Sequence, residues 1–231
     1  MKEFSSLEKK LHIHFNNVNV LKQALVHKSY INENPGFPLD HNERLEFLGD
    51  AVLELAVTEH LFKHYPRTPE GDMTNWRAAL VNSTMLAQVG SEFGLNEYLY
   101  LSKGERKDRN QKARQYILAN AFEALIGAIY LDQGMDTAKD FVIKNMVAKL
   151  PDILKHKLYL DPKTRFQETA QEKVSITPTY KVLKEEGPDH AKNFTVGVYL
   201  NEELIAQGEG LSKQEAQVLA AEYALRAKQW E

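Results

Sequence analysis

Two long segments of the chain carry apolar residues on nearly every side of a predicted helix. In residues 42–57 the apolar side chains run almost all the way round, so we expect this helix to be buried on most sides. Residues 116–131 repeat the pattern, and only Asn120 and Glu123, three residues apart and therefore on one face, interrupt it. The few polar residues on two such helices need an explanation.

The first of these helices carries three carboxylates on one face. Glu43, Glu46 and Asp50 are spaced three and four residues apart. Stacked carboxylates on a buried helix repel one another and lose solvation, so a cation must compensate them. Arg44 and Arg77 are candidate partners, and for Glu46 with Asp50 alone an ion pair and a bound metal ion remain equally open.

Glycines in the middle of both helices indicate how the two segments meet. Gly49 and Gly127 each cost about 1 kcal/mol relative to alanine in a helix, which a close approach of two helices would explain. Crossing the helices there brings four polar side chains together: Glu46, Asp50, Asn120 and Glu123. The acid on the second helix shifts the interpretation from an ion pair towards a metal site.

The remaining pattern predicts an all-α first domain over residues 1–154. The central helix should end near Tyr65, because Pro66 cannot continue it. Residues 32–41 and the basic stretch 102–114 are expected to be loops, the second of them mobile. The other expected helices are one ending near Phe15, one capped by Asn17, one from Pro69 with Thr68 as its cap to Val81, one capped by Ser83 and closed by Gly94, and one from about Thr137 to Leu150.

The pattern changes after a linker at residues 155–162. Residues 163–173 predict a helix, and three strands follow at 180–186, 194–200 and 204–207. A capping box at Ser212 and Glu215 opens a last helix rich in alanine. The order α-β-β-β-α over residues 163–231 predicts a small α+β domain, and the chain is therefore a multidomain protein.

Composition narrows the class of protein. The 231 residues are 43% hydrophobic and 26% charged, as in an ordinary globular protein. No stretch approaches the roughly 18 uncharged apolar residues of a membrane span, and the first residues lack a signal-peptide core. The absence of cysteine excludes disulfides and thiolate metal sites and fits a reducing cytoplasm. The histidines show no ligand spacing, since His60 and His64 lack the glutamate of a His-Glu-x-x-His zinc motif.

Several motifs resemble those of one enzyme family. Residues 42–50 (NERLEFLGD) match the signature of bacterial ribonuclease III, and further motifs follow in family order: 24–30 (ALVHKSY), 70–73 (EGDM), 101–105 (LSKGE) and 122–128 (FEALIGA). The tail is similar to a double-stranded RNA-binding domain through 167–168 (QE), 187–190 (GPDH) and 208–213 (GEGLSK). The resemblance covers nearly the whole chain.

The resemblance implies a Mg²⁺-dependent endonuclease, with Mn²⁺ able to substitute. It would cut both strands of double-stranded RNA as a homodimer and leave 5′-phosphate and 3′-hydroxyl ends. Ribosomal RNA and structured transcripts in the cytoplasm would be its substrates, with no membrane involved. By motif match the metal ligands are Glu46, Asp50, Asn120 and Glu123, the catalytic residues Asp50 and Glu123, the supporting acids Glu43 and Glu70, and the dimer contact Phe47. Hard oxygen ligands of this kind suit Mg²⁺.

The tail matches RNA-binding positions but departs from a basic footprint. Residues 161–231 hold nine Lys and Arg against twelve Asp and Glu. Because duplex RNA is read largely by shape and through 2′-hydroxyl and phosphate contacts, polar residues can serve. The expected contacts are Thr164, Gln167, Glu168, Gln171, His190 and Lys213. Gln214 stands where family members usually have a second lysine, so we expect weak, salt-sensitive binding.

One departure concerns the metal site itself. Family members ordinarily carry aspartate at the position of Asn120, whose amide oxygen is neutral. The site thereby loses one of four negative charges, and metal affinity should fall. A natural active variant, a naturally weakened enzyme and an engineered substitution all fit the sequence. The alternative to an active nuclease is a protein that binds duplex RNA without efficient cleavage.

Overall fold

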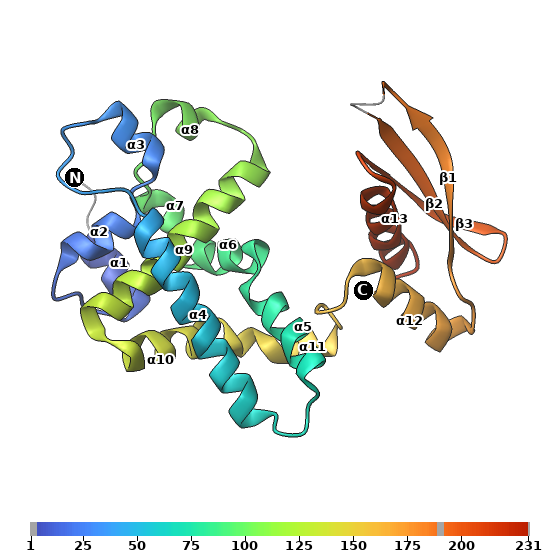
Figure 1. The fold of residues 1–231 in the computed structure, drawn as a ribbon, viewed down its shortest axis with the longest axis horizontal. Helices are drawn as coiled ribbons and strands as arrows, with labels where there is room; N and C mark the ends of the chain where they lie inside the picture. Colours follow the sequence, from blue (N-terminus) through green and yellow to red (C-terminus); the bar gives the residue numbers. More distant parts are fainter. Residues whose placement is uncertain (1–3, 189–191, 231) are drawn as a thin grey trace. The chain divides into compact units, whose positions relative to one another are not determined.

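The computed structural model of the chain describes residues 4–188 and 192–230, which form two compact units (Figure 1). The units comprise residues 1–153 and 154–231. The first is entirely helical and the second has the order α-β-β-β-α, so the predicted fold class is confirmed. Within the described ranges, no helix combines the length and apolar character that crossing a membrane requires.

The first unit consists of helices joined by short connections. In chain order they are α1 (Phe4–Leu11), α2 (Val18–Ala24), α3 (Lys28–Glu33), α4 (Glu43–His64), α5 (Glu70–Val81), α6 (Ser83–Glu92), α7 (Leu95–Tyr98), α8 (Lys103–Lys107), α9 (Gln111–Gln133), α10 (Met135–Asn145), a 3-10 turn η1 (Val147–Lys149) and α11 (Leu150–Lys155). The central helix ends at His64, just before Pro66, as its sequence predicts.

Helices α4 and α9 form the centre of this unit and contact each other more extensively than any other pair of elements. They lie side by side in Figure 1. A Cβ atom on Gly49 would lie 1.8 Å from the carbonyl oxygen of Glu123, and one on Gly127 would lie 2.3 Å from that of Leu45. No other residue type fits at either position without a shift of the backbone. The close approach predicted from the two glycines is therefore confirmed.

The two central helices differ in burial. In α9 every residue from Leu118 to Ile129 is buried except Asn120 and Glu123. Helix α4 was expected to be buried on most sides, and that expectation is wrong. Phe47, Leu55 and Phe62 are 82%, 57% and 72% exposed, because the described helices of the first unit leave these side chains largely uncovered. We call these three residues the exposed α4 stripe.

Two predicted helix caps are displaced by one residue. Asn82, not Ser83, caps α6, since its side chain accepts a hydrogen bond from the Met85 backbone N–H at 3.0 Å. Pro69, not Thr68, occupies the cap position of α5, and no side chain caps that helix. By contrast, Asn17 caps α2 as predicted, accepting from the Asn19 N–H. Helices α2, α5 and α6 begin within one residue of the predicted positions. The first helix, however, ends at Leu11 and not near Phe15, and the helix predicted from about Thr137 to Leu150 is α10, which ends at Asn145 and is followed by η1.

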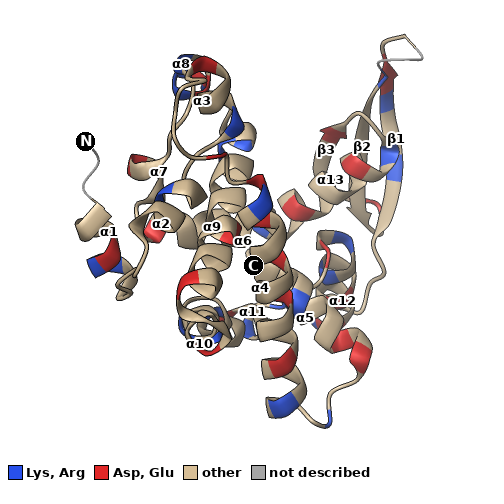
Figure 2. Cartoon of the chain, turned by 60° about the vertical axis from the view of Figure 1, so that its left-hand side comes forward, with Lys and Arg blue, Asp and Glu red and all other residues tan. Residues whose placement is uncertain are grey.

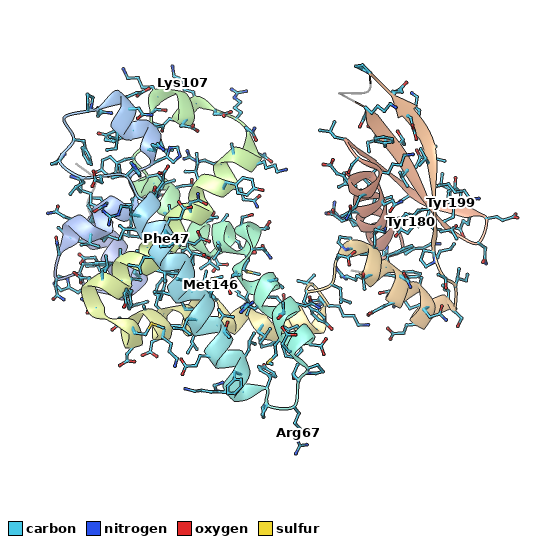
Figure 3. All side chains as sticks on the ribbon, in the orientation of Figure 1. Phe47, Arg67, Lys107, Met146, Tyr180 and Tyr199 are labelled. Atoms are coloured by element: carbon cyan, nitrogen blue, oxygen red, sulfur yellow. The ribbon has the colours of Figure 1, made fainter. Side chains whose placement is uncertain are left out.

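The basic stretch 102–114 is not a continuous loop. Ser102 accepts a hydrogen bond from the Glu105 N–H and starts α8, and Asn110 accepts from Lys112 and Ala113 and starts α9. These caps satisfy N–H groups that would otherwise lack partners, so they favour helix despite the high charge. Figure 2 shows basic residues gathered on α8, to which Lys107 in Figure 3 belongs.

The second unit packs two helices on one face of a three-stranded sheet. Its elements are α12 (Pro162–Val174), β1 (Thr179–Glu186), β2 (Asn193–Leu200), β3 (Glu203–Gly210) and α13 (Lys213–Ala227). The strands are antiparallel in the order β1-β2-β3. Its core comprises Phe166, Ala170, Val198, Leu200, Ala220, Ala221, Ala224 and Leu225. The third strand is longer than the predicted 204–207, because Glu203 and residues 208–210 also pair with β2.

Candidate functional site

The crossing of α4 and α9 sets the position of the predicted site. Glu46 and Asp50 are one helical turn apart on α4, on either side of the close contact that Gly49 makes with the backbone of Glu123. On α9, Asn120 and Glu123 are the two residues that interrupt the buried surface. The Asn120 side chain lies close enough to Glu46 to lower the pKa of that carboxyl, so the two helices meet through their polar side chains as well as through their backbones.

The carboxylates at the crossing repel one another. Burial, followed by the charges of Asp50 and Glu46, raises the pKa of Glu123 to about 7. Burial and the charge of Glu43 raise the pKa of Glu46, while the Asn120 side chain opposes that rise. We call Glu46, Asp50 and Glu123 the acid cluster. The structure brings its members within electrostatic reach of one another, with Asn120 beside them.

The neighbouring acids on α4 have cationic partners, whereas the acid cluster has none. Glu43 pairs with Lys28 at 3.2 Å, and Glu54 pairs with Arg77 at 2.9 Å. Over residues 4–188 and 192–230, no ion pair involves Glu46, Asp50 or Glu123. Arg77, a predicted partner for the α4 acids, therefore compensates Glu54 and leaves the cluster uncompensated.

Carboxylate and amide oxygens without a partner cation suit a hard divalent cation, so the donor set fits such an ion. The side chains are not yet gathered around one position. In the described part of the chain, no group of three acidic or histidine side chains is close enough to hold a metal ion. Ligation would therefore require the side chains at the crossing to rotate towards one point.

Glu70, the second predicted supporting acid, lies away from the acid cluster. It opens α5 and accepts a hydrogen bond from the Thr74 hydroxyl at 2.9 Å. With Phe62 and Arg77 it lines a pocket of about 250 Å³ between α4 and α5. It is not among the charges that shift the pKa of Glu46 or Glu123, whereas Glu43 acts directly on Glu46.

Phe47, the predicted dimer contact, follows Glu46 on α4 and is labelled in Figure 3. Its exposed fraction of 82% is the highest among the exposed large hydrophobic residues of the described chain. It belongs to the exposed α4 stripe, which runs along the helix that carries Glu46 and Asp50. Two members of the acid cluster, Glu46 and Asp50, therefore share one helix with this apolar surface.

The predicted RNA contacts lie on the surface of the second unit. Gln167, Glu168 and Gln171 line one shallow hollow on α12, and Thr164 is exposed one turn earlier. Lys213 opens α13, where it pairs with Glu185 at 2.8 Å. His190 lies outside the described residues. The structure therefore gathers three contacts on α12 and puts Lys213 at the start of another helix.

Sequence reasoning missed two charged residues beside these sites. Glu54 follows Asp50 by four residues, so the spacing that singled out the other α4 acids extends to it. Glu185 gave no comparable signal, because its contact with Lys213 joins β1 to α13 across the fold. Helical spacing could therefore have identified Glu54, whereas identifying Glu185 requires the register of the sheet.

The chain is similar to two families over most of its length. Residues 17–150 match the family described as Ribonuclease-III-like, and residues 162–228 match the double-stranded RNA binding motif. A protein of Pelotomaculum thermopropionicum named Ribonuclease 3 is 45% identical over 95% of this chain and 90% of its own length. The Ribonuclease 3 of Nitratiruptor sp. is 42% identical over 98% of this chain and 97% of its own length.

A solved structure resembles the first unit. The nuclease domain of ribonuclease III from Campylobacter jejuni is 36% identical and superposes with a TM-score of 0.56. The match covers 64% of this chain and 99% of that domain. That domain is described as flexible in a region involved in dimer formation.

Proposed function

The chain belongs to the ribonuclease III family of endoribonucleases that act on double-stranded RNA, and on that premise we propose that it hydrolyses both strands with the help of Mg²⁺. The products would carry 5′-phosphate and 3′-hydroxyl ends. We assign nuclease activity to residues 1–154 and RNA binding to residues 163–231, with residues 155–162 as the linker between them.

The acid cluster carries this proposal. Glu46, Asp50, Asn120 and Glu123 would hold the Mg²⁺ ion, and Mn²⁺ could replace it. When bound, the ion supplies an activated water and neutralises charge on the scissile phosphate. Asp50 and Glu123 are the catalytic residues in this proposal. The pKa of about 7 for Glu123 supports it, because a carboxylate without a partner cation gains most from a divalent ion.

The surrounding acids would act in support. Glu43 lies close enough to raise the pKa of Glu46, and its pair with Lys28 keeps it at the edge of the cluster. Glu70 would reach the substrate from α5, outside the set of metal ligands. Neither residue is needed to ligate the ion in this proposal.

We propose a homodimer in which each subunit cuts one strand. The exposed α4 stripe supports this, since large apolar side chains left exposed on one helix are typical of a protein–protein interface. Phe47 would be the central contact. The dimer-forming region described for the Campylobacter jejuni domain is consistent with such an assembly.

RNA binding by the second unit would use the exposed polar face of α12 and the start of α13. Thr164, Gln167, Glu168 and Gln171 would contact 2′-hydroxyl groups in one minor groove, and His190 would enter the next. Lys213 would meet phosphate, helped by the dipole of α13. With a net negative tail, binding should be weak and sensitive to salt, and dimerisation would supply avidity. Ribosomal RNA precursors and structured transcripts in the cytoplasm are the substrates we propose.

Asn120 supports a second candidate function. Its amide is neutral and lies beside Glu46, so the site holds one charge fewer than a set of four carboxylates. A chain with this residue would then bind duplex RNA and cut it poorly. We propose that cleavage is retained, because three carboxylates without cationic partners remain.

One cleavage assay distinguishes these functions. Long duplex RNA is incubated with Mg²⁺ or Mn²⁺ and the unchanged chain, Asn120→Asp or Glu123→Gln. Cleavage by the unchanged chain that Glu123→Gln lowers by at least about 10³-fold would support the nuclease, since removing a metal-ligating carboxylate removes charge stabilisation in the transition state. Cleavage by Asn120→Asp alone would identify a binding protein. Cleavage that survives Glu123→Gln would refute the site.

A further inference from the structure

The ion pair between Glu185 and Lys213 follows from the register of the sheet. Glu185 on β1 is paired with Phe194 on β2, and Phe194 is paired with Gly210 on β3. Gly210 lies against the first turn of α13, where a Cβ atom would come within 2.8 Å of the Ala216 nitrogen. This row of three residues therefore runs beneath the start of α13.

Lys213 is held over that row. Its ammonium lies 2.8 Å from the Glu185 carboxylate and 5.4 Å from the centre of the Phe194 ring. The hydrogen bond with Lys213 is the main cause that lowers the pKa of Glu185, and the charge of Lys192 adds to it. A carboxylate thus pairs with the lysine that opens α13, in the kind of surroundings that a phosphate group would favour.

We propose that Glu185 sets the RNA affinity of the second unit by competing with RNA phosphate for Lys213. The inference rests on the phosphate contact of Lys213 in the proposed function. In the chain without RNA, the Glu185 carboxylate pairs with the Lys213 ammonium in place of an RNA phosphate. Duplex RNA must displace it, and the displaced carboxylate then loses its contact with Lys213 and lies beside a polyanion.

This competition has a signature in the salt dependence. A lysine that neutralises phosphate releases counterions from the RNA, which makes binding weaken as salt rises. When Lys213 leaves Glu185, the freed carboxylate gathers a cation again and cancels part of that release. Removing the charge of Glu185 should therefore tighten binding and steepen its salt dependence together.

The adjacent residue provides a matched control. Successive residues of a strand point to opposite faces, so Glu186 faces away from α13 and pairs with Lys184 at 2.7 Å. Glu185→Gln and Glu186→Gln remove the same charge from neighbouring positions on β1, where Figure 2 shows both signs of charge. Only the first change frees the lysine at the start of α13.

The experiment measures the affinity of the full chain for a duplex RNA of about 30 base pairs, longer than the footprint of about 16 for one such domain. A chelator prevents cleavage, and salt is varied from about 50 to about 300 mM. We expect Glu185→Gln to tighten binding about 3- to 10-fold at the lowest salt and to steepen the slope of log affinity against log salt by a part of the roughly 0.9 that one phosphate contact contributes. Glu186→Gln should change affinity by less than about 2-fold.

A double substitution completes the test. In a chain that already carries Lys213→Gln, Glu185→Gln should not tighten RNA binding, because the lysine for which Glu185 and phosphate compete is absent. Equal tightening by Glu185→Gln and Glu186→Gln would overturn the inference, as would a gain that persists without Lys213. Weaker binding by Glu185→Gln would also overturn it. An unchanged chain that does not bind duplex RNA would refute the proposed function instead.

Discussion

At the crossing of α4 and α9, three carboxylates lie together and the described chain supplies no cation for them, whereas beside α13 the carboxylate of Glu185 lies 2.8 Å from the ammonium of Lys213. The first site lies where two helices are in backbone contact, with Glu46 and Glu123 partly buried and Asp50 exposed. The second is on the surface, with side chains 40% and 54% exposed. One site lacks a counter-charge and the other already has its own.

The difference indicates how each site would respond to its ligand. The acid cluster holds repulsive energy that a divalent cation would relieve, so the ion should stabilise the fold as it binds. The surface pair loses an existing contact when phosphate arrives, so the net gain is small. The two sites therefore predict opposite responses: a divalent cation gains from the repulsion at the first, and RNA phosphate must overcome an existing contact at the second.

The largest expected effect comes from separating the central helices. Gly49→Ala would put a methyl group 1.8 Å from the backbone oxygen of Glu123, so the backbones must move apart. We expect the free energy of unfolding to fall by about 3 kcal/mol or more, since overpacking a tight contact costs this much. Urea unfolding measures the loss. The shift also separates Asp50 from Glu123, so cleavage should fall with it.

Gly71→Ala is the control for this change. Gly71 lies in α5 and nothing would lie within 4 Å of an added Cβ atom. Alanine should be neutral there or stabilise the helix by up to about 1 kcal/mol. A similar loss for both variants would mean that helix propensity, and not the close crossing, determines the result.

The next effect is a dependence of stability on pH that originates at Glu123. Its folded pKa of about 7 lies above the ordinary value of 4.5, so the folded state holds the proton more tightly than the unfolded state. The associated stability is fully present below pH 4.5 and is lost as pH rises through 7. After allowance for solvent screening we expect a loss of roughly 2 kcal/mol between these limits.

Urea unfolding with a chelator, at several pH values from about 5 to about 8, tests this loss. Glu123→Gln should remove it and become more stable than the unchanged chain at the upper end of the range. Glu202→Gln, on an exposed turn of the other unit, should leave the profile unchanged. If the free energy of unfolding changed with pH in the same way for the unchanged chain and for Glu123→Gln, the carboxylates of the acid cluster would not repel one another in the folded state.

Local patterns were enough to predict the central helices and their contact. The pair of mid-helix glycines identified the crossing because glycine in a helix has a cost that only a close neighbour offsets. Asn120 and Glu123 were identifiable because every other position around them is apolar. In both cases the informative residue departs from its surroundings within one helix.

Features that depend on other elements were not predictable. The apolar residues of α4 could not show that one side would lack cover, since Phe47 and Leu45 look alike in sequence but are 82% and 5% exposed. Helix α3, capped by His27, was not predicted, because histidine is an uncommon cap. Likewise, the sequence offers several acids as partners for Arg77, and only the packing of α5 against α4 selects Glu54.

A smaller effect is expected from restoring charge at Asn120. Asn120→Asp adds a fourth carboxylate and removes the amide that lowers the pKa of Glu46. We expect about tenfold tighter binding of Mg²⁺ or Mn²⁺, equivalent to about 1.4 kcal/mol. Calorimetric titration of the full chain would measure it. Without metal the variant should be less stable than the unchanged chain, because repulsion within the cluster rises.

Asn201→Asp is the matched control, since it adds the same charge on the turn between β2 and β3. Asn201 has φ of 56°, a conformation that aspartate also tolerates. It should leave divalent-ion affinity unchanged. Equal tightening by both variants would mean that net charge, not the ligand position, governs metal binding.

The smallest effect should come from the exposed pairs of the second unit. Lys157 lies 3.5 Å from Glu168 and 3.6 Å from Glu172, with its side chain 39% exposed. Because exposed pairs contribute little, we expect Lys157→Gln to change the free energy of unfolding by less than about 0.5 kcal/mol. Urea unfolding beside Lys173→Gln, on the helix that carries Glu168 and Glu172, tests this. A loss above about 1 kcal/mol would mean that these ion pairs contribute to the stability of the unit. RNA could then not replace surface ion pairs of this unit without destabilising it.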